Sequence, residues 1–152
     1  MIKRTYPQTR LRRTRSKSFL RDLIAENNLN TDDLIQPIFI ADQSEDKIGI
    51  PSMPGIHRHN LDSLYFEVEA LTQLGIKSIA IFPAIDAGKK DKDGSYALDE
   101  GNIVCLALTG LAERFPDIIK IADVALDPYT DHGHDGLLIN GRVENDETVR
   151  LL

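Results

Sequence analysis

The sequence has little cysteine, no tryptophan and no long apolar run. Its one cysteine, Cys105, has no partner for an internal disulfide, and its apolar neighbours predict a buried packing role. No apolar run approaches the roughly 18 to 20 residues that a helix needs to cross a bilayer. The basic N-terminus is not followed by the apolar stretch of a signal peptide. We therefore expect a cytoplasmic protein that does not contact membranes.

Acidic residues are absent from the first 21 positions, which divides the chain electrostatically. Residues 1–21 carry a net charge of +8 and the remainder −14, within a total of −6. A basic arm on an acidic body suits either a nucleic acid or the acidic surface of a second copy. The segment TRLRRTR lacks the interleaved aromatic side chains that stack on bases, so nucleic acid is not the expected partner. We predict that residues 1–16 form an extended arm for subunit contact; a solvated tail and phosphate binding are the alternatives.

What the chain does contain is an alternation of apolar runs and amphipathic segments. With 41% hydrophobic and 28% charged residues in 152, it has the composition of a globular domain with one core. Three runs predict buried strands, namely LIQPIFIAD, IKSIAIFPA and IIKIADVAL. Helical spacing of apolar residues in 61–74 and 102–115 predicts a helix between each pair of strands. The order is typical of right-handed βαβ crossovers, so the predicted fold class is α/β with a parallel sheet.

Other segments give local predictions. The segment SKSFLRDLIAENN predicts a short helix, and Asn140-Gly141 between apolar residues predicts a tight hairpin. A further helix should begin in DETVRLL. IPSMPGIHRHN is predicted to be a loop, because it contains two prolines and a glycine. The polar stretch 85–101 is too long for an ordinary connection, and such loops are usually functional or mobile.

The candidate site is DVALDPYTDHGHDG, residues 123–136, which gathers four aspartates and two histidines after an apolar run. Pro128 and two glycines exclude a helix. As a strand, the segment places Asp123 and Ala125 on one side and ends at Asp127. Active sites of α/β sheets and barrels lie at the carboxyl ends of the strands, which favours a functional role for these carboxylates. Alternatively, Asp123 is structural and is held by backbone hydrogen bonds or an arginine.

Other polar groups near this edge have weaker patterns. Asp86 follows the second strand, where an aspartate is usually a cap or turn residue. His132 and His134 lie in a glycine-bounded loop and could bind a metal or transfer protons. Carboxylate and imidazole without thiolate favour magnesium over zinc.

Taken together, the segments resemble the N-terminal part of the porphobilinogen synthase family, also called δ-aminolevulinic acid dehydratase. The resemblance runs through TRLRRTR, DDLIQPIFI, PSMPGIHR, LGIKSIAIFPAID, RFPDI, DVALDPYTDHGHDG and NDETV. It implies a (β/α)8 TIM barrel, of which residues 17–152 are a truncated N-terminal part that supplies about the first three β/α units after the arm. It also implies homo-octamers, formed through the arm, of a lyase that condenses two 5-aminolevulinate molecules to porphobilinogen with loss of water, in haem biosynthesis.

The resemblance also implies roles for particular residues. In zinc-using relatives, cysteines that hold the metal occupy the positions of Ala125, Asp127 and Asp135. This sequence therefore resembles the branch that lacks active-site zinc and responds to magnesium, whose allosteric ligands would lie outside this chain. Asp123, Asp127 and Asp135 are the implied catalytic residues, and Asp127 and Asp135 are also weak metal candidates. Residues 131–145 resemble the active-site lid, with His132 and His134 in it, although Asp131 replaces the family's serine or threonine.

One departure concerns the catalytic lysines. The family forms Schiff bases on two lysines in the second half of the barrel. The family's sequence around these lysines has no match in this chain, whose lysines after the arm are Lys47, Lys77, Lys89, Lys90, Lys92 and Lys120. We therefore expect this chain alone to be inactive. The alternatives are a non-enzymatic truncated relative that acts as an interaction module, and a small phosphate- or nucleic-acid-binding α/β domain, which only the basic arm supports.

Overall fold

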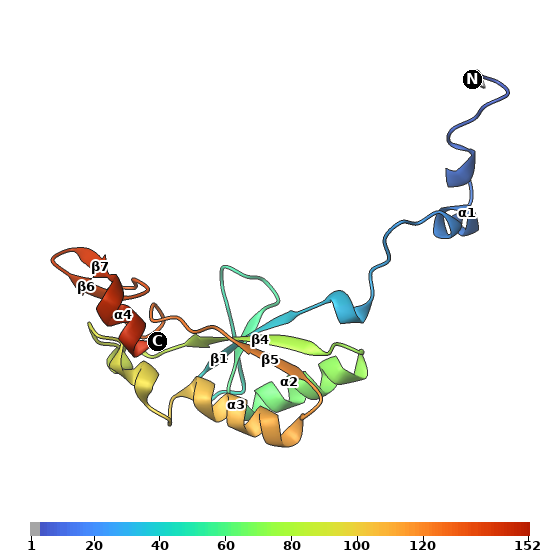
Figure 1. The fold of residues 1–152 in the computed structure, drawn as a ribbon. Coiled ribbons are helices and arrows are strands. Elements are labelled where there is room, and N and C mark those ends of the chain that lie inside the picture. The colour runs from blue at the N-terminus through green and yellow to red at the C-terminus, as the bar shows by residue number, and fades with distance from the viewer. Residues whose placement is uncertain (1–3) are drawn as a thin grey trace. The chain divides into compact units, whose positions relative to one another are not determined.

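The computed structural model describes residues 4–152 (Figure 1). The chain divides into a compact unit that ends at Asn30 and a second unit, Thr31–Leu152. The first three residues of the predicted arm, 1–16, lie outside the described residues. The first unit holds the 3-10 helix η1 (Arg13–Arg15) and the helix α1 (Ser18–Leu23). The helix α1 is shorter than predicted, because the chain leaves helical geometry at Ile24.

The second unit is built on a five-stranded sheet with the order β2-β3-β1-β4-β5. β1 pairs in parallel with β3 and β4, and β4 pairs in parallel with β5, whereas β2 and β3 are antiparallel. The three predicted strands are therefore confirmed as parallel neighbours. The strands are β1 (Gln36–Ala41), β2 (Lys47–Gly49), β3 (His57–His59), β4 (Ser78–Ala84) and β5 (Ile119–Ala122).

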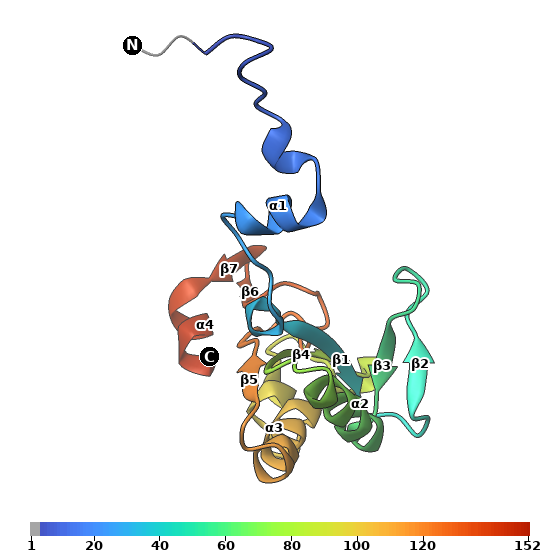
Figure 2. The same ribbon diagram turned by 90° about the vertical axis from the view of Figure 1, so that its right-hand side faces the viewer.

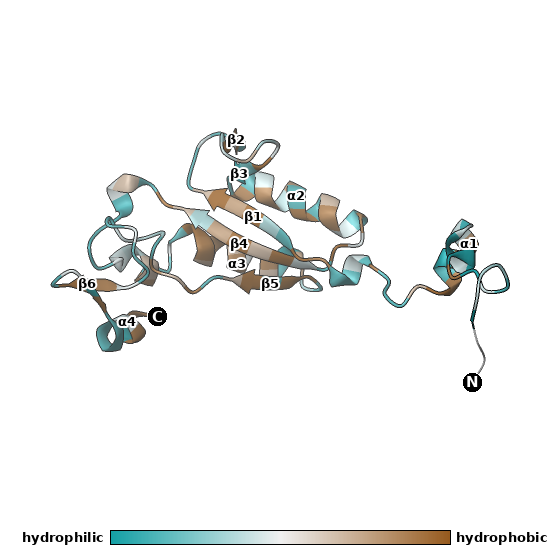
Figure 3. Ribbon diagram, turned by 90° about the horizontal axis from the view of Figure 1, so that it is seen from above, coloured by the Kyte–Doolittle hydropathy of each residue, from teal (hydrophilic) through white to brown (hydrophobic). Residues whose placement is uncertain are grey.

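Two helices cover one face of this sheet, α2 (Leu61–Gln73) and α3 (Ile103–Arg114) (Figures 1 and 2). Each begins at an asparagine whose side chain accepts backbone N–H groups of the first turn, as helix N-caps do. Apolar side chains from the strands and from both helices form the core, and Figure 3 shows β1 and β4 as largely apolar. The fully buried members include Ile40, Leu64, Val68, Ile79, Ile81 and Leu111.

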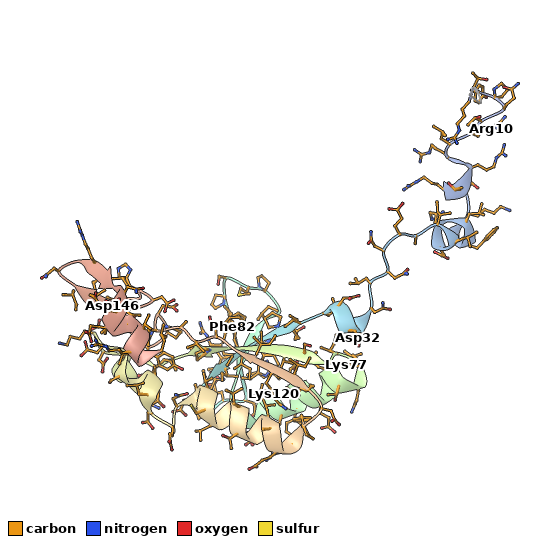
Figure 4. The ribbon with its side chains drawn as sticks, viewed as in Figure 1. Arg10, Asp32, Lys77, Phe82, Lys120 and Asp146 are labelled. Atoms are coloured by element: carbon orange, nitrogen blue, oxygen red, sulfur yellow. The ribbon has the colours of Figure 1, made fainter. Side chains whose placement is uncertain are left out.

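Two further side-chain contacts connect β1 and β4 or the segments that lead into them. Ahead of β1 and β4, the Asp32 carboxylate pairs with the Lys77 ammonium at 2.8 Å (Figure 4). On the face away from the helices, Phe39 and Phe82 lie in register, with ring centroids 5.8 Å apart. Within residues 4–152, no helix is long and apolar enough to span a bilayer.

After β5 the chain forms a hairpin and a last helix. The hairpin consists of β6 (Leu137–Ile139) and β7 (Arg142–Glu144), and α4 (Asn145–Leu151) follows. Asn140 and Gly141 both have positive φ angles, of 49° and 75°, as a two-residue type I′ turn requires. The predicted hairpin is confirmed, and so is the helix that begins at the end of the chain.

Several local predictions were wrong. The segment 50–60, predicted as a loop, contributes β3, because the backbone of His57–His59 pairs with both β1 and β2. Cys105 is only half-buried, because the buried side of α3 is formed by Ile103, Ala107 and Leu111.

Candidate functional site

The candidate site lies where the parallel strands end. β1 ends at Ala41, β4 at Ala84 and β5 at Ala122. An aspartate follows each of them within two residues: Asp42, Asp86 and Asp123. Because the three strands are parallel, their carboxyl ends lie at one edge of the sheet, which is where α/β proteins place their active sites.

Asp123 lies at this edge, but its environment differs from the one predicted. The sequence predicted a strand through Leu126, with Asp123 inside it. The strand instead ends at Ala122, and the Asp123 side chain is exposed. Asp127 is exposed as well. Neither carboxylate therefore carries the large desolvation cost of a buried charge, and both are accessible to a small molecule.

Asp127 belongs to a tight turn that starts from a buried residue. Leu126 is only 1% exposed, and its carbonyl accepts hydrogen bonds from the backbone N–H groups of Tyr129 (2.9 Å) and Thr130 (3.0 Å). The Leu126 N–H donates to Oδ1 of Asp135 at 2.7 Å. Burial raises the pKa of Tyr129 to about 12, so its hydroxyl stays protonated. Buried residues thus hold the turn, while its Asp127 carboxylate is exposed.

The two histidines of the predicted lid contact each other and a neighbouring loop. Nδ1 of His132 accepts the backbone N–H of His134 at 3.1 Å. The ring proton must then lie on Nε2, which donates to the Lys92 carbonyl at 3.2 Å. The two rings lie 5.4 Å apart, centroid to centroid. His132 therefore links the lid to the polar segment that follows β4.

That polar segment, 85–101, has regular local structure. It contains the 3-10 helices η3 (Ala87–Lys89) and η4 (Ser95–Leu98). Asp86 caps η3 by accepting the Gly88 N–H at 2.7 Å, which confirms its predicted cap role. The Asp91 carboxylate accepts hydrogen bonds from Ser95 and from the Asp93 backbone, and the Ser95 bonds in particular hold the pKa of Asp91 below its usual value.

Backbone contacts join this segment to the loop after β5. Asp91 and Thr130 form a parallel bridge, and the Asp131 N–H donates to the Asp91 carbonyl at 2.9 Å. Gly94 has a φ of 64° and approaches the Thr130 and Leu126 side chains, where an L residue would be strained. The two loops at the carboxyl edge therefore form one folded unit.

Sequence reasoning missed an ion pair at this edge, between Lys89 and Asp42. Nζ of Lys89 lies 2.5 Å from Oδ2 of Asp42 and 3.3 Å from the Tyr96 hydroxyl. The hydrogen bonds to Asp42 and Tyr96 raise the pKa of Lys89, so its amine is held in the charged form and is not a free nucleophile. Asp42 and Tyr96 also line a cavity of about 240 Å³. The available signal was the position of Asp42, the first acidic residue after an apolar run, like Asp123.

The donor set does not form a metal site within this part of the chain. Among residues 4–152, no three His, Cys, Asp or Glu side chains are grouped so that they could hold an ion. Asp127 and Asp135, the candidates from the sequence, thus have no third ligand among the described side chains, and one oxygen of Asp135 already accepts a hydrogen bond.

Comparison with known proteins decides the family. The sequence pattern of the family described as delta-aminolevulinic acid dehydratase matches residues 8–152. The chain belongs to this family. Two curated dehydratases illustrate the similarity: that of Chlamydia pneumoniae is 44% identical over 142 residues and that of Bacillus subtilis 41% identical over 143. These alignments cover 93% and 94% of this chain but 43% and 44% of the relatives. This chain thus spans less than half the length of the curated relatives it matches.

A solved structure agrees with this membership. The delta-aminolevulinic acid dehydratase (porphobilinogen synthase) of Toxoplasma gondii, crystallised with the reaction product porphobilinogen, superposes with a TM-score of 0.89 at 38% sequence identity. The match covers 95% of this dehydratase-family chain and 41% of the other. The predicted α/β class is confirmed in this form: the mixed α/β structure is similar to a TIM-barrel-family synthase and covers part of it.

Proposed function

We propose that the protein to which this segment belongs is a porphobilinogen synthase, a lyase that condenses two 5-aminolevulinate molecules to porphobilinogen with loss of water. One observation carries the proposal: nearly the whole chain superposes on a synthase crystallised with porphobilinogen. In the proposed arrangement, residues 17–152 supply about the first three β/α units of a (β/α)8 barrel.

Of the three carboxylates that the resemblance implies as catalytic, Asp123 and Asp127 are proposed to act directly on substrate, whereas one oxygen of Asp135 already accepts the Leu126 N–H. Condensation forms one carbon–carbon and one carbon–nitrogen bond, and protons must leave the amine and the carbon that attack. Exposed carboxylates at the carboxyl edge can accept such protons or orient a substrate ammonium group. Asp123 would orient substrate or transfer protons, and Asp127 would lie beside a reacting amine. His132 and His134 would belong to a lid over the site, residues 131–145.

The Schiff-base lysines are proposed to come from elsewhere in the protein. A Schiff base needs an uncharged amine, and Lys89, at this edge, is held as an ammonium by Asp42. We therefore propose that the segment alone does not catalyse the reaction and contributes acid–base groups to a site completed by other residues.

The proposed metal requirement follows from the donor types. Ala125, Asp127 and Asp135 provide no thiolate, so we propose that the site uses no zinc. Magnesium would act at an allosteric site whose ligands lie outside this chain. Further proposals are assembly into homo-octamers through the basic arm and a location in the cytoplasm, without nucleic-acid or membrane partners.

The test is turnover of 5-aminolevulinate by the complete protein that contains this segment. We expect porphobilinogen to form in the presence of a zinc chelator that spares magnesium. Asp123→Asn should lower kcat by about 10²- to 10⁴-fold, the range of general acid–base catalysis. Asp86→Asn is the matched control, because Asp86 follows a neighbouring strand but caps η3. Absence of porphobilinogen would contradict the proposal, and loss of activity with the chelator would contradict only the zinc-free site.

A further inference from the structure

Leu126 anchors the loop that follows β5. Its side chain is buried, and hydrogen bonds engage both of its backbone polar groups. The carbonyl is used locally, by Tyr129 and Thr130. The N–H is used by Asp135, nine positions further along the chain. A buried N–H that loses its partner costs about 1–3 kcal/mol, so the conformation of the turn depends on this carboxylate.

The Asp135 carboxylate connects the end of this loop to its start at Leu126. Oδ1 lies 2.7 Å from the Leu126 nitrogen, at the short end of the range for an N–H···O hydrogen bond. A second link crosses the same loop, because the Thr130 hydroxyl donates to the His134 carbonyl at 2.9 Å. Asp127 lies within the ring of residues 126–135 that the first of these bonds closes, and the second bond braces the later part of that ring, residues 130–134.

The other side of Asp135 is anchored as well. Gly136 follows it, is buried and has a φ of 150°. The Leu137 N–H then donates to the Thr148 hydroxyl at 3.0 Å, which connects β6 to α4. Asp135 thus connects the turn that carries Asp127 to the β6–β7–α4 segment.

These contacts distinguish Asp135 from Asp123 and Asp127. One of its oxygens is occupied by a backbone N–H, and no three-ligand group surrounds it among residues 4–152. We propose that Asp135 is a positioning residue: its carboxylate fixes the turn that presents Asp127, and it neither binds a metal nor exchanges protons with substrate. The catalytic part of this inference rests on the proposed function, whereas its structural part stands independently.

The structural part is tested on the 152-residue chain by amide hydrogen exchange and ¹⁵N NMR. Asp135→Asn keeps an acceptor oxygen, whereas Asp135→Ala removes it. We expect the Leu126 amide to remain protected in Asp135→Asn and to exchange roughly 10-fold faster or more in Asp135→Ala. Asp131→Ala is the matched control, because Asp131 joins the loop network through its backbone N–H. Equal protection in all variants, or equal loss in Asp135→Asn and Asp135→Ala, would overturn the inference.

A second measurement covers the case in which Asp135→Ala does not fold. In the wild-type chain the Leu126 amide should be protected from exchange, and in Asp135→Asn its exchange rate should stay within a few-fold of the wild-type rate. A Leu126 amide that exchanges in the wild-type chain at the rate of an unprotected amide would contradict the contact.

The catalytic part is tested on the complete protein. If Asp135 acts by position, Asp135→Asn should retain clearly more kcat than Asp135→Ala; if it transfers protons, both should lose kcat equally. Equal losses combined with a protected Leu126 amide would refute the positioning role. If the protein makes no porphobilinogen at all, the proposed function fails, while the Leu126 result still decides the structural part.

Discussion

His59 is a residue whose protonation the fold opposes. It is 6% exposed, and its Nδ1 lies 2.9 Å from the Ser63 hydroxyl of α2. Lys47 lies opposite it on β2, and Glu67 of α2 pairs with Lys47 at 3.0 Å. Burial, followed by Lys47, lowers the pKa of His59 from 6.5, with a smaller lowering by His57, although Glu67 and Ser63 act in the opposite direction.

The expected consequence is a loss of stability in acid. Because the folded-state pKa lies below the unfolded value of 6.5, this contribution is complete above pH 6.5 and is lost as the pH falls toward the folded-state pKa. The free energy of unfolding, from urea titrations at pH 7.5 to 5, should fall with a slope of at most about 1.4 kcal/mol per pH unit from this group.

Two variants isolate His59 from the carboxylates that also titrate in acid. His59→Gln should flatten the slope between pH 6.5 and 5. His57→Gln, at an exposed position on the same strand, should keep it. Identical slopes in the two variants would show that His59 is not responsible.

At the scale of elements, the contact between α2 and α3 depends on a glycine inside a helix. Gly110 lies in the middle of α3, where glycine is about 1 kcal/mol less favourable than alanine. A Cβ at this position would overlap the Tyr65 hydroxyl and lie 2.8 Å from its Cζ. The guanidinium of Arg114 lies over the same ring, 4.2 Å from its centroid. The glycine therefore makes room for the Tyr65 ring.

This contact predicts a change of sign between two backgrounds. Gly110→Ala should destabilise the wild type by about 1 kcal/mol, because Tyr65 must move out of its packed position. In a Tyr65→Ala background the same substitution should stabilise by about 0.5–1 kcal/mol, because only helix propensity remains. Thermal or urea unfolding of the four proteins measures the coupling. Additive effects would mean that the two residues do not interact.

The elements that the sequence predicted are those with local signals. Asn60 and Gly75 delimit α2 because a cap and a residue with a φ of 84° act on their own neighbours. β3 had no such signal: its residues are His-Arg-His, and its pairing with β1 joins distant positions. The end of β5 was also missed, because Val124, Ala125 and Leu126 are as apolar as the strand itself.

The candidate site shows the same difference between features with a local signal and contacts between distant positions. The parallel order of three strands sufficed to place Asp123 at the carboxyl edge, since that order follows from the alternation of strands and helices. The contacts Asp42–Lys89 and Asp135–Leu126 could not be predicted, because no local pattern specifies which lysine or which backbone N–H a carboxylate will reach.

For the whole molecule, charge is the property that bears on assembly. Residues 1–21 carry +8 and the remainder −14, so a second copy offers the basic segment an oppositely charged partner. Exposed charges attract over about 10 Å at 0.1 M salt and about 3 Å at 1 M. If the proposed arm makes a subunit contact through its arginines, assembly should therefore weaken as salt increases.

Deletion of residues 1–16 from the complete protein should reduce the number of subunits per assembly, obtained from the mass by light scattering at 0.1 M salt. A variant of full length in which Arg10, Arg12 and Arg13 are replaced by glutamine should show the same reduction, because it loses charge without losing chain. Its remaining assembly should respond less to 1 M salt than that of the wild type. A glutamine variant that assembles like the wild type, beside a deletion that does not, would assign the contact to apolar or backbone groups of the arm. An unchanged number of subunits in both variants would show that the segment makes no subunit contact.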